Sequence, residues 1–249
     1  MDGALTGPDS TPKVIITAGL HGSASTWIFN VVRELMVAGY GEGQVRAVFG
    51  ESSAEALQAG ELGEGVRLIW KTHVGGADFW EFVAQRKAVV LVSIRDPRDA
   101  LVSMMQRFHA PIARMLREMI RDCALATACA KAGAPVFRYE DRFFDHPGTV
   151  ASIAETIGLT LPPATLERIF ADWRTESVRD RAARLFELPP ERLIDKGPAQ
   201  RLDIATQVHE GHIGDTRPGK WRDILDPATA RLITMQLFEF MLHFDYSIW

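Results

Sequence analysis

The chain has 249 residues, of which 47% are hydrophobic and 24% charged, and its formal net charge is −4. These proportions are those of an ordinary globular protein and exclude a disordered or fibrous chain. The acidic balance disfavours a general nucleic-acid-binding protein, and the longest apolar runs fall short of the ~18 residues that a membrane span needs.

The N-terminal residues 1–12 contain turn-forming and acidic side chains and predict a flexible leader. Residues 1–13 show no apolar h-region, so we expect no secretory signal. The two cysteines, Cys123 and Cys129, fall on different faces of one predicted helix, where they cannot pair, and two thiols alone do not make a zinc site. A reducing cytoplasm is therefore the expected compartment.

The first regular elements are a strand and a helix joined by a glycine-containing turn. Residues 13–18 form a β-branched run that predicts a buried strand. From Ser25 onwards apolar residues recur at helical spacing, and Gly39 predicts the end of that helix. Strand, turn and helix thus follow one another in a P-loop-like order.

The same alternation continues along the chain. Asp96 and Pro97 have the residue types preferred at the N-cap and first position of a helix. Residues 187–226 are rich in Pro, Gly and charge and predict a long loop. The other expected elements are strands at 66–72, 88–94 and 134–139, and helices at 78–86, 96–107, 112–131, 149–157, 163–172 and 227–240. Apolar strands alternating with helices predict one α/β domain over residues 13–249, with a parallel sheet flanked by helices.

The turn after the first strand, residues 17–27, is a candidate anion site. The carboxyl end of a strand in a parallel sheet is where ligands bind, and the N-terminus of the following helix attracts negative charge. The hydroxyls of Ser23, Ser25 and Thr26 add hydrogen-bond donors. Ala24 and Ser25 replace the second glycine and the lysine of the nucleotide-binding pattern GxxxxGK[ST], which disfavours an NTPase. The structural alternative is a tight turn with a Ser or Thr helix cap.

A second candidate lies in residues 95–103. Arg95 ends a buried strand, where an unpaired guanidinium is costly, and its fork suits a phosphate. Ser103 follows two helical turns later. The alternative is that Arg95 pairs with Asp96 or Asp99 and that Ser103 is an ordinary helical residue.

The third candidate ends the strand predicted at 66–72. Lys71 and His73 are two positions apart and project from the same face of an extended chain. A histidine there can act as a general base, and the lysine can stabilise developing negative charge. A lone histidine is otherwise most often structural.

In this order the three segments resemble the sulfotransferases that use 3′-phosphoadenosine 5′-phosphosulfate (PAPS). In that family a turn ending in Thr-Trp cradles the 5′-phosphosulfate, and an R-x-P-x-D-x-x-x-S segment binds the 3′-phosphate. Thr26 with Trp27 matches the first, and Arg95 with Ser103 the second. The likeness spans about residues 13–225, and the arginine–serine segment is its most specific part.

The resemblance implies a complete site without a metal. It makes His73 the general base, with Lys71 beside it, and places Trp27 against adenine. Residues 136–141 are similar to a strand end that would put Tyr139 in the nucleotide pocket, and residues 217–221 to a loop that folds over the nucleotide. The nucleotide-binding residues so expected are His21, Gly22, Ser23, Ala24, Ser25, Thr26, Trp27, Arg95, Ser103, Tyr139, Arg217, Gly219 and Lys220.

Two positions depart from the family pattern. Gly22 occupies the place of a Lys or Arg that contacts the leaving phosphate. Either Lys71 or His21 supplies the charge, or transfer is slow, or the protein binds nucleotide without turning it over. The C-terminal loop lacks an Arg-Lys-Gly triplet and leaves Arg217 and Lys220 as substitutes.

The predicted function is transfer of a sulfuryl group from PAPS to a small-molecule hydroxyl acceptor, with adenosine 3′,5′-bisphosphate (PAP) as product. Two alternatives stay open: a non-catalytic nucleotide-binding protein of the same fold, and a P-loop-type small-molecule kinase. We expect neither a nucleic-acid nor a membrane partner, and the sequence leaves the acceptor and the oligomeric state open.

Overall fold

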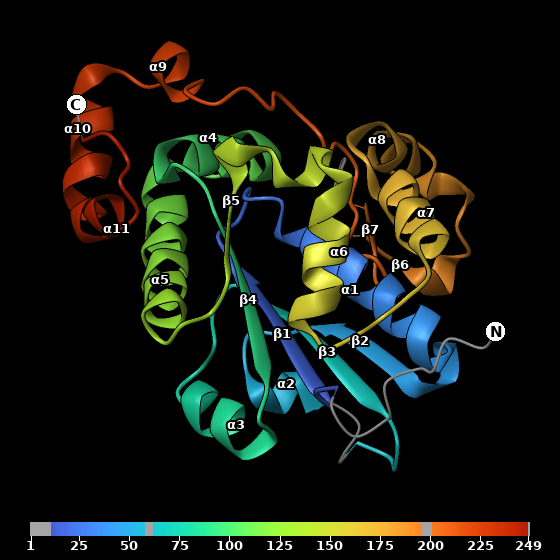
Figure 1. Ribbon diagram of the computed structural model, residues 1–249. Helices are drawn as coiled ribbons and strands as arrows, with labels where there is room; N and C mark the ends of the chain where they lie inside the picture. The colour runs from blue at the N-terminus through green and yellow to red at the C-terminus, as the bar shows by residue number, and fades with distance from the viewer. Residues whose placement is uncertain (1–10, 58–61, 196–200, 249) are drawn as a thin grey trace.

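The computed structural model describes residues 11–57, 62–195 and 201–248. The predicted leader, residues 1–12, lies outside this range apart from its last two residues. The single-domain α/β architecture predicted from the sequence is confirmed, with one main sheet between two layers of helices (Figure 1).

The main sheet has five strands in the order β2-β3-β1-β4-β5, and each neighbouring pair is parallel. The strands are β1 (Val14–Gly19), β2 (Val45–Phe49), β3 (Arg67–Thr72), β4 (Val89–Ile94) and β5 (Val136–Arg138). Parallel strands require crossover connections, which the helices between them supply.

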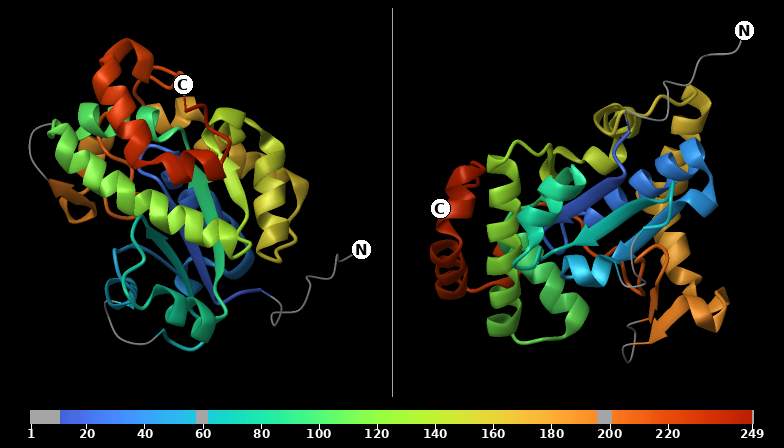
Figure 2. Two further views of the ribbon diagram at one scale, coloured as in Figure 1. Left: turned by 90° about the vertical axis from the view of Figure 1, so that its left-hand side faces the viewer. Right: turned by 90° about the horizontal axis from the view of Figure 1, so that it is seen from below.

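Each face of the sheet packs on its own hydrophobic core. Successive strand residues point to opposite faces, so Ile15 and Ile69 join the core beneath helix α1 (Ser25–Tyr40), whereas Ile16 and Trp70 join the core beneath α5 (Ile112–Lys131). Figure 2 shows α5 on one side of the sheet and α1 on the other.

The remaining helices extend these two layers. On the side of α5 lie α10 (Pro227–Gln236) and α11 (Phe238–His243), and beside α1 lie α6 (Pro147–Thr156) and α7 (Pro163–Trp173) (Figure 2). None of the helices within the described ranges is both long and apolar enough to cross a bilayer. The other helices are α2 (Ser53–Leu57), α3 (Phe79–Arg86), α4 (Pro97–Phe108), α8 (Thr175–Ala183) and α9 (Trp221–Ile224).

Several boundaries differ from the sequence prediction. Helix α1 runs past Gly39 to Tyr40, and Gly41, with φ of 84°, donates its N–H to the carbonyl of Val37. The loop predicted at 187–226 contains the antiparallel pair β6 (Leu193–Asp195) and β7 (Arg201–Asp203) as well as α9. The helix predicted at 227–240 is divided at Leu237 into α10 and α11.

The topology brings the three candidate segments together. Strand β1 is central, and the strands on its two sides, β3 and β4, come later in the chain. In such a sheet the carboxyl ends of the strands around the central one form a crevice where ligands bind. The turn after β1, the segment after β3 and the start of α4 after β4 all lie at this edge.

Candidate active site

The turn between β1 and α1 is shaped to present backbone N–H groups. Gly22 and Ala24 have positive φ values of 75° and 62°. No side chain caps the N-terminus of α1, so the predicted Ser or Thr cap is absent and the first N–H groups of this helix remain available to an anion. The hydroxyl of Ser23 is not available, because it is buried against the carbonyl of Leu20 and the hydroxyl of Ser93.

Arg95 contacts this turn. Its side chain is buried, and Nη1 donates a hydrogen bond to the carbonyl oxygen of Gly22 at 3.1 Å and lies 3.5 Å from Oγ of Ser103. Nη2 lies 3.4 Å from the carbonyl oxygen of Arg217, and the guanidinium stacks 3.9 Å from the ring centre of Tyr139. These partners are neutral oxygens and a π face.

The two carboxylates that follow Arg95 in the sequence, Asp96 and Asp99, bind other groups. Asp96 caps α4 and pairs with Arg98 at 2.7 Å. Asp99 accepts the backbone N–H groups of Gly219 at 2.6 Å and Trp221 at 2.9 Å. Within the described residues no carboxylate lies in ion-pair range of Arg95, and its Nε is buried without a partner.. A buried cation with an orphan donor is costly unless an anion binds it.

A cavity with about 1000 Å³ of space, its open mouth included, opens beside Arg95. Trp27 lines it and is nearly buried, with an indole N–H that has no partner among the described residues. We call it the nucleotide cavity, after the residues predicted to bind a nucleotide that line it. These residues are Gly22, Ala24, Thr26, Trp27, Arg95, Ser103, Tyr139 and Lys220. Its shape and its unpaired donors suit an aromatic base linked to phosphate groups.

The segment before α9 closes one side of the nucleotide cavity. Lys220 is buried, and its ammonium donates to the carbonyl oxygen of Asp215 at 2.8 Å. Burial, with the charge of Arg95 next, lowers the pKa of Lys220. Gly219 has φ of 81°, and its backbone N–H donates to Asp99. The residue does not line the cavity.

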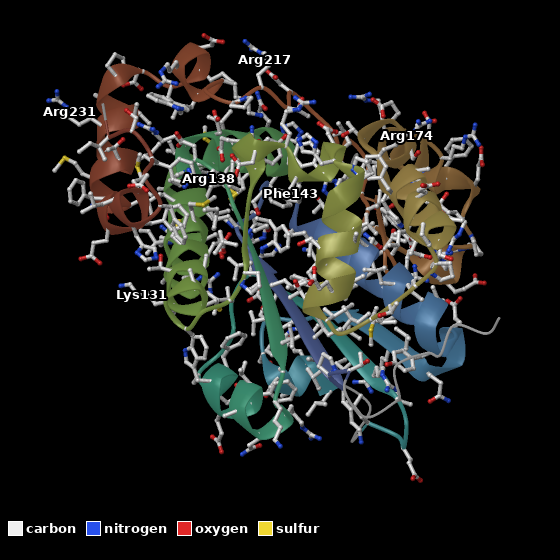
Figure 3. The ribbon with its side chains drawn as sticks, in the orientation of Figure 1. Lys131, Arg138, Phe143, Arg174, Arg217 and Arg231 are labelled. Carbon is white, nitrogen blue, oxygen red and sulfur yellow. The ribbon has the colours of Figure 1, made fainter. Side chains whose placement is uncertain are left out.

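Arg217 departs from the expectation that it reaches the nucleotide. Its side chain is 67% exposed and is paired with Asp215 and Asp223 at the surface (Figure 3). Only its carbonyl oxygen, which faces Arg95, approaches the site. Ser25 is buried and lies outside the walls of the cavity.

A second cavity, here called the acceptor cavity, adjoins the first. Lys71 and His73, predicted as catalytic residues, both line it. His21, predicted to bind the nucleotide, lies here instead of in the nucleotide cavity. The remaining lining residues are Thr26, Phe49, Arg107, Phe108, Leu202, Gln207 and His209.

Both ring nitrogens of His73 are engaged. Nδ1 lies 2.6 Å from the carbonyl oxygen of Gly19 and must donate to it, which leaves Nε2 to accept from the ammonium of Lys71 at 3.0 Å. Burial first, and then the neighbouring His21 and Lys71, hold the pKa of His73 well below its ordinary value. Burial, with repulsion from Arg107, lowers the pKa of Lys71 to about 7.

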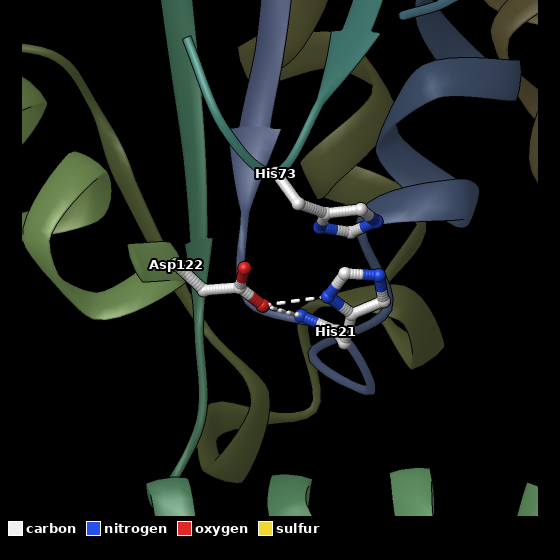
Figure 4. Close-up of side chains that lie close together, drawn as sticks. All are labelled: His21, His73 and Asp122. Atoms are coloured by element: carbon white, nitrogen blue, oxygen red, sulfur yellow. Dashed lines mark hydrogen bonds and ion pairs between the residues drawn. The ribbon is translucent and has the colours of Figure 1, made fainter. Parts of the chain in front are cut away.

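His21 stacks on His73, with ring centres 3.6 Å apart, and contacts Asp122 on α5 (Figure 4). Its Nδ1 lies 2.6 Å from Oδ2 of Asp122, and the same oxygen accepts the backbone N–H of His21 at 2.9 Å. Ligand atoms of these three residues fall within 4.8 Å of one another. Lone pairs of stacked imidazoles lie in separate, nearly parallel planes, so the two rings cannot aim at one metal ion. The arrangement fits proton transfer better than metal binding.

The two cavities share a wall formed by Thr26 and Arg107. Arg107 is partly buried and forms no hydrogen bond or ion pair with any residue of the described ranges.. Burial lowers its pKa to about 10, so it stays charged at neutral pH. Arg107 was not among the residues predicted from the sequence. The available signal was its position one helical turn after Ser103, on the same face of α4.

Neither a protein-family model nor a curated protein matches the sequence. Solved structures do match. Mouse sulfotransferase SULT7A1 complexed with PAP superposes with a TM-score of 0.62 at 15% identity, over 96% of this chain and 92% of that one. Retinol dehydratase in a complex with retinol and PAP gives 0.61 at 14% identity, over 93% and 82%. Retinol dehydratase with androsterone and inactive cofactor PAP gives 0.58 at 12% identity, over 93% and 81%.

These similarities extend over nearly the whole chain. At this level of identity they establish architecture. The resemblance found in the sequence motifs is therefore confirmed in three dimensions: the chain has the sulfotransferase fold.

Proposed function

We propose that this protein transfers the sulfuryl group of PAPS to the hydroxyl of a small-molecule acceptor. The observation that carries the proposal is Arg95, a buried guanidinium with no carboxylate partner in the described chain, which contacts the uncapped turn before α1. A ligand with two separate anionic groups and an aromatic base would satisfy both features and Trp27.

Different residues would bind the two ends of that nucleotide. Arg95, Ser103 and the buried Lys220 would hold the 3′-phosphate, and the N–H groups of the β1–α1 turn the 5′ end. PAPS supplies the sulfuryl group when it is bound. The acceptor would occupy the acceptor cavity, whose aromatic side chains Phe49 and Phe108 favour an apolar body.

Arg107 would replace the cation that Gly22 lacks. It lies with Thr26 on the wall common to both cavities, which is where donor and acceptor must meet. Charge develops on the leaving phosphate during transfer, and a preorganised cation at that point stabilises it. Lys71, from the opposite side of the acceptor cavity, would add to this stabilisation.

A magnesium-dependent kinase is the main rival among enzymes, and a non-catalytic nucleotide-binding protein is the other alternative. The turn argues against a kinase, because Ser25 stands where the phosphate-binding lysine would be. A protein that only binds nucleotide would need no histidine pair in the adjoining cavity.

Calorimetry and a transfer assay separate these functions. We expect PAP to bind more tightly than ADP, and radiolabelled PAPS to sulfate simple phenols such as 2-naphthol with no effect of EDTA. PAP binding without transfer to any phenol or alcohol would identify a binding protein, and ATP-dependent, magnesium-requiring phosphorylation would identify a kinase.

We further propose a cytoplasmic location, because the two buried free thiols, Cys123 and Cys129, are compatible with a reducing compartment. The partner would be a small hydroxyl compound that fits the acceptor cavity.

A further inference from the structure

We propose that His21, oriented by Asp122, is the general base that removes the proton of the acceptor hydroxyl; this inference rests on the proposed sulfuryl transfer. It assigns to His21 the role that the sequence resemblance gives to His73. Figure 4 shows the arrangement of the three side chains.

The first argument is the number of free lone pairs. The Nε2 of His73 accepts from Lys71 and its Nδ1 donates to Gly19, so this ring has no unoccupied acceptor atom. A base must present a lone pair within hydrogen-bond reach of the proton that it takes. His73 could accept a proton from the acceptor only after its hydrogen bond with Lys71 had broken.

His21 has that free lone pair. Because a carboxylate only accepts, the short contact with Asp122 fixes the proton of His21 on Nδ1 and leaves Nε2 as an acceptor. No residue in the described ranges bonds to this Nε2. The His21 side chain is 21% exposed and lines the acceptor cavity, so a ligand there can reach it.

Asp122 is placed to support the charged form of His21. Its side chain is fully buried, and Oδ2 accepts both the ring N–H and the backbone N–H of His21. Oδ1 is buried with no partner in the described chain. A buried carboxylate beside Nδ1 holds the imidazole in one tautomer and stabilises the imidazolium that forms.

Different charged or titratable groups lie next to the rings of His21 and His73. Arg107 on α4 is the permanent cation of the acceptor cavity, Lys71 on β3 is an amine with a pKa lowered to about 7, and Asp122 on α5 is the carboxylate in contact with the His21 ring. Lys71 lies against His73, whereas Asp122 lies against His21. The carboxylate therefore lies next to Nδ1 of His21, and the amine of Lys71 lies next to Nε2 of His73.

In the proposed step, Nε2 of His21 takes the proton from the acceptor O–H as that oxygen bonds to sulfur. The bond from sulfur to the 5′-phosphate oxygen breaks, and its electron pair stays on that oxygen, near Arg107. The product is a sulfate ester, PAP and a His21 imidazolium paired with Asp122. Release of that proton to water restores the base.

The test compares His21→Gln and His73→Gln with two acceptors at pH 8. The first acceptor, 2-naphthol, must lose a proton during transfer. The second, 4-nitrophenol, is already largely ionised. The matched control is His243→Gln, an exposed histidine on α11. PAP affinity, measured by calorimetry, reports on the nucleotide cavity in each variant.

We expect His21→Gln to lose about 10²- to 10⁴-fold in kcat with 2-naphthol, to lose far less with 4-nitrophenol, and to bind PAP normally. Asp122→Asn should lower kcat with 2-naphthol while KM changes little. Independently of activity, long-range proton–nitrogen NMR spectra of the unliganded protein should show His21 protonated on Nδ1, and Asp122→Asn should alter that signature.

Three results would overturn the assignment. An acceptor-dependent loss in His73→Gln but not in His21→Gln would return the role of base to His73. Equal losses with both acceptors, or lost PAP binding in His21→Gln, would show that His21 is structural. A wild-type protein that binds PAP but transfers sulfuryl to no acceptor would overturn the proposed function and this inference with it.

Discussion

Nη1 of Arg95 donates a hydrogen bond to the carbonyl oxygen of Gly22 at 3.1 Å, across 73 positions of sequence. This contact joins the end of β4 to the turn after β1, so the two segments thought to hold opposite ends of the nucleotide form one wall. The same contact gives the guanidinium only a neutral oxygen. Since none of the described carboxylates lies within ion-pair distance of this guanidinium, an anionic ligand can pair with it.

Replacing Arg95 should weaken nucleotide binding selectively. Truncating one partner of a buried, hydrogen-bonded charge pair costs about 2–5 kcal/mol, or roughly 30- to several-thousand-fold in Kd. We expect Arg95→Gln to lose PAP affinity by this factor and to change the affinity for adenosine 5′-monophosphate little, since that ligand lacks the 3′-phosphate. Arg168→Gln, on the exposed face of α7, is the control. Similar losses for both nucleotides would contradict the assignment.

Replacing Arg107 should affect turnover more than binding. Its position on the wall between the two cavities predicts contact with the developing charge. We expect Arg107→Ala to lower kcat about 10²- to 10³-fold and Arg107→Lys to recover part of the loss. Steady-state kinetics with 2-naphthol measures both. An unchanged kcat in Arg107→Ala would remove Arg107 from the mechanism.

A lysine introduced at Gly22 should not rescue the Arg107→Ala variant. Gly22 has φ of 75°, and a Cβ atom there would lie 3.3 Å from Cβ of Ser103. A side chain would strain the turn that presents the N–H groups. We expect Gly22→Lys to lower PAP affinity, as measured by calorimetry. Recovered turnover in the double variant would show instead that the turn tolerates the lysine of the family pattern.

The buried ammonium of Lys71 makes stability depend on pH. Its pKa is lowered to about 7 from 10.5, so between these values the unfolded chain binds a proton that the folded chain has lost. Stability should therefore rise with pH from 7 to 10, with a slope of at most about 1.4 kcal/mol per pH unit from this group. Lys71→Met should remove this contribution and stabilise the protein most near pH 7. Urea unfolding at pH 7, 8.5 and 10 checks the sign. A variant whose advantage grows with pH would contradict it.

The Asp99 carboxylate holds the C-terminal segment against α4 by accepting from Gly219 and Trp221. Hydrogen bonds to a charged group contribute about 1.5–3 kcal/mol each, so Asp99→Ala should loosen the segment that carries Lys220. We expect faster trypsin cleavage after Lys220, which is buried in the wild-type protein, and weaker PAP binding. Saturating PAP should slow the cleavage in wild type. Equal cleavage rates in variant and wild type would show that other contacts hold the segment.

Local sequence signals located most of the helices and strands. The periodic apolar pattern gave helix α5 its observed bounds, and Asp96 with Pro97 marked the start of α4. Strand β2 was not predicted, because it lies at the sheet edge, is only partly buried and carries Arg46. The pair β6–β7 was also missed, since each strand is three residues long and no residue pattern distinguishes it from a loop.

Only the site residues that belong to short sequence motifs could be predicted from the sequence. Thr26, Trp27, Arg95 and Ser103 were predicted from their resemblance to the family motifs, and all line one cavity. The contact between His21 and Asp122 spans 101 positions, and nothing local in the sequence indicates it. Asp122 read as an ordinary polar residue within a helix. Its role depends on the packing of α5 beneath the sheet, which only the tertiary structure reveals.

The stacking of His21 on His73 limits the positive charge that the two rings can carry together. With ring centres 3.6 Å apart, a charge on one imidazole opposes a charge on the other, and this repulsion adds to burial, the larger cause, in lowering the pKa of His73. The pair therefore carries one positive charge at a time, in addition to the N–H proton that each neutral ring keeps. For the base proposed above, each turnover would have to pass the acquired proton to solvent before the next begins, and the exposed edge of His21 would be its exit route.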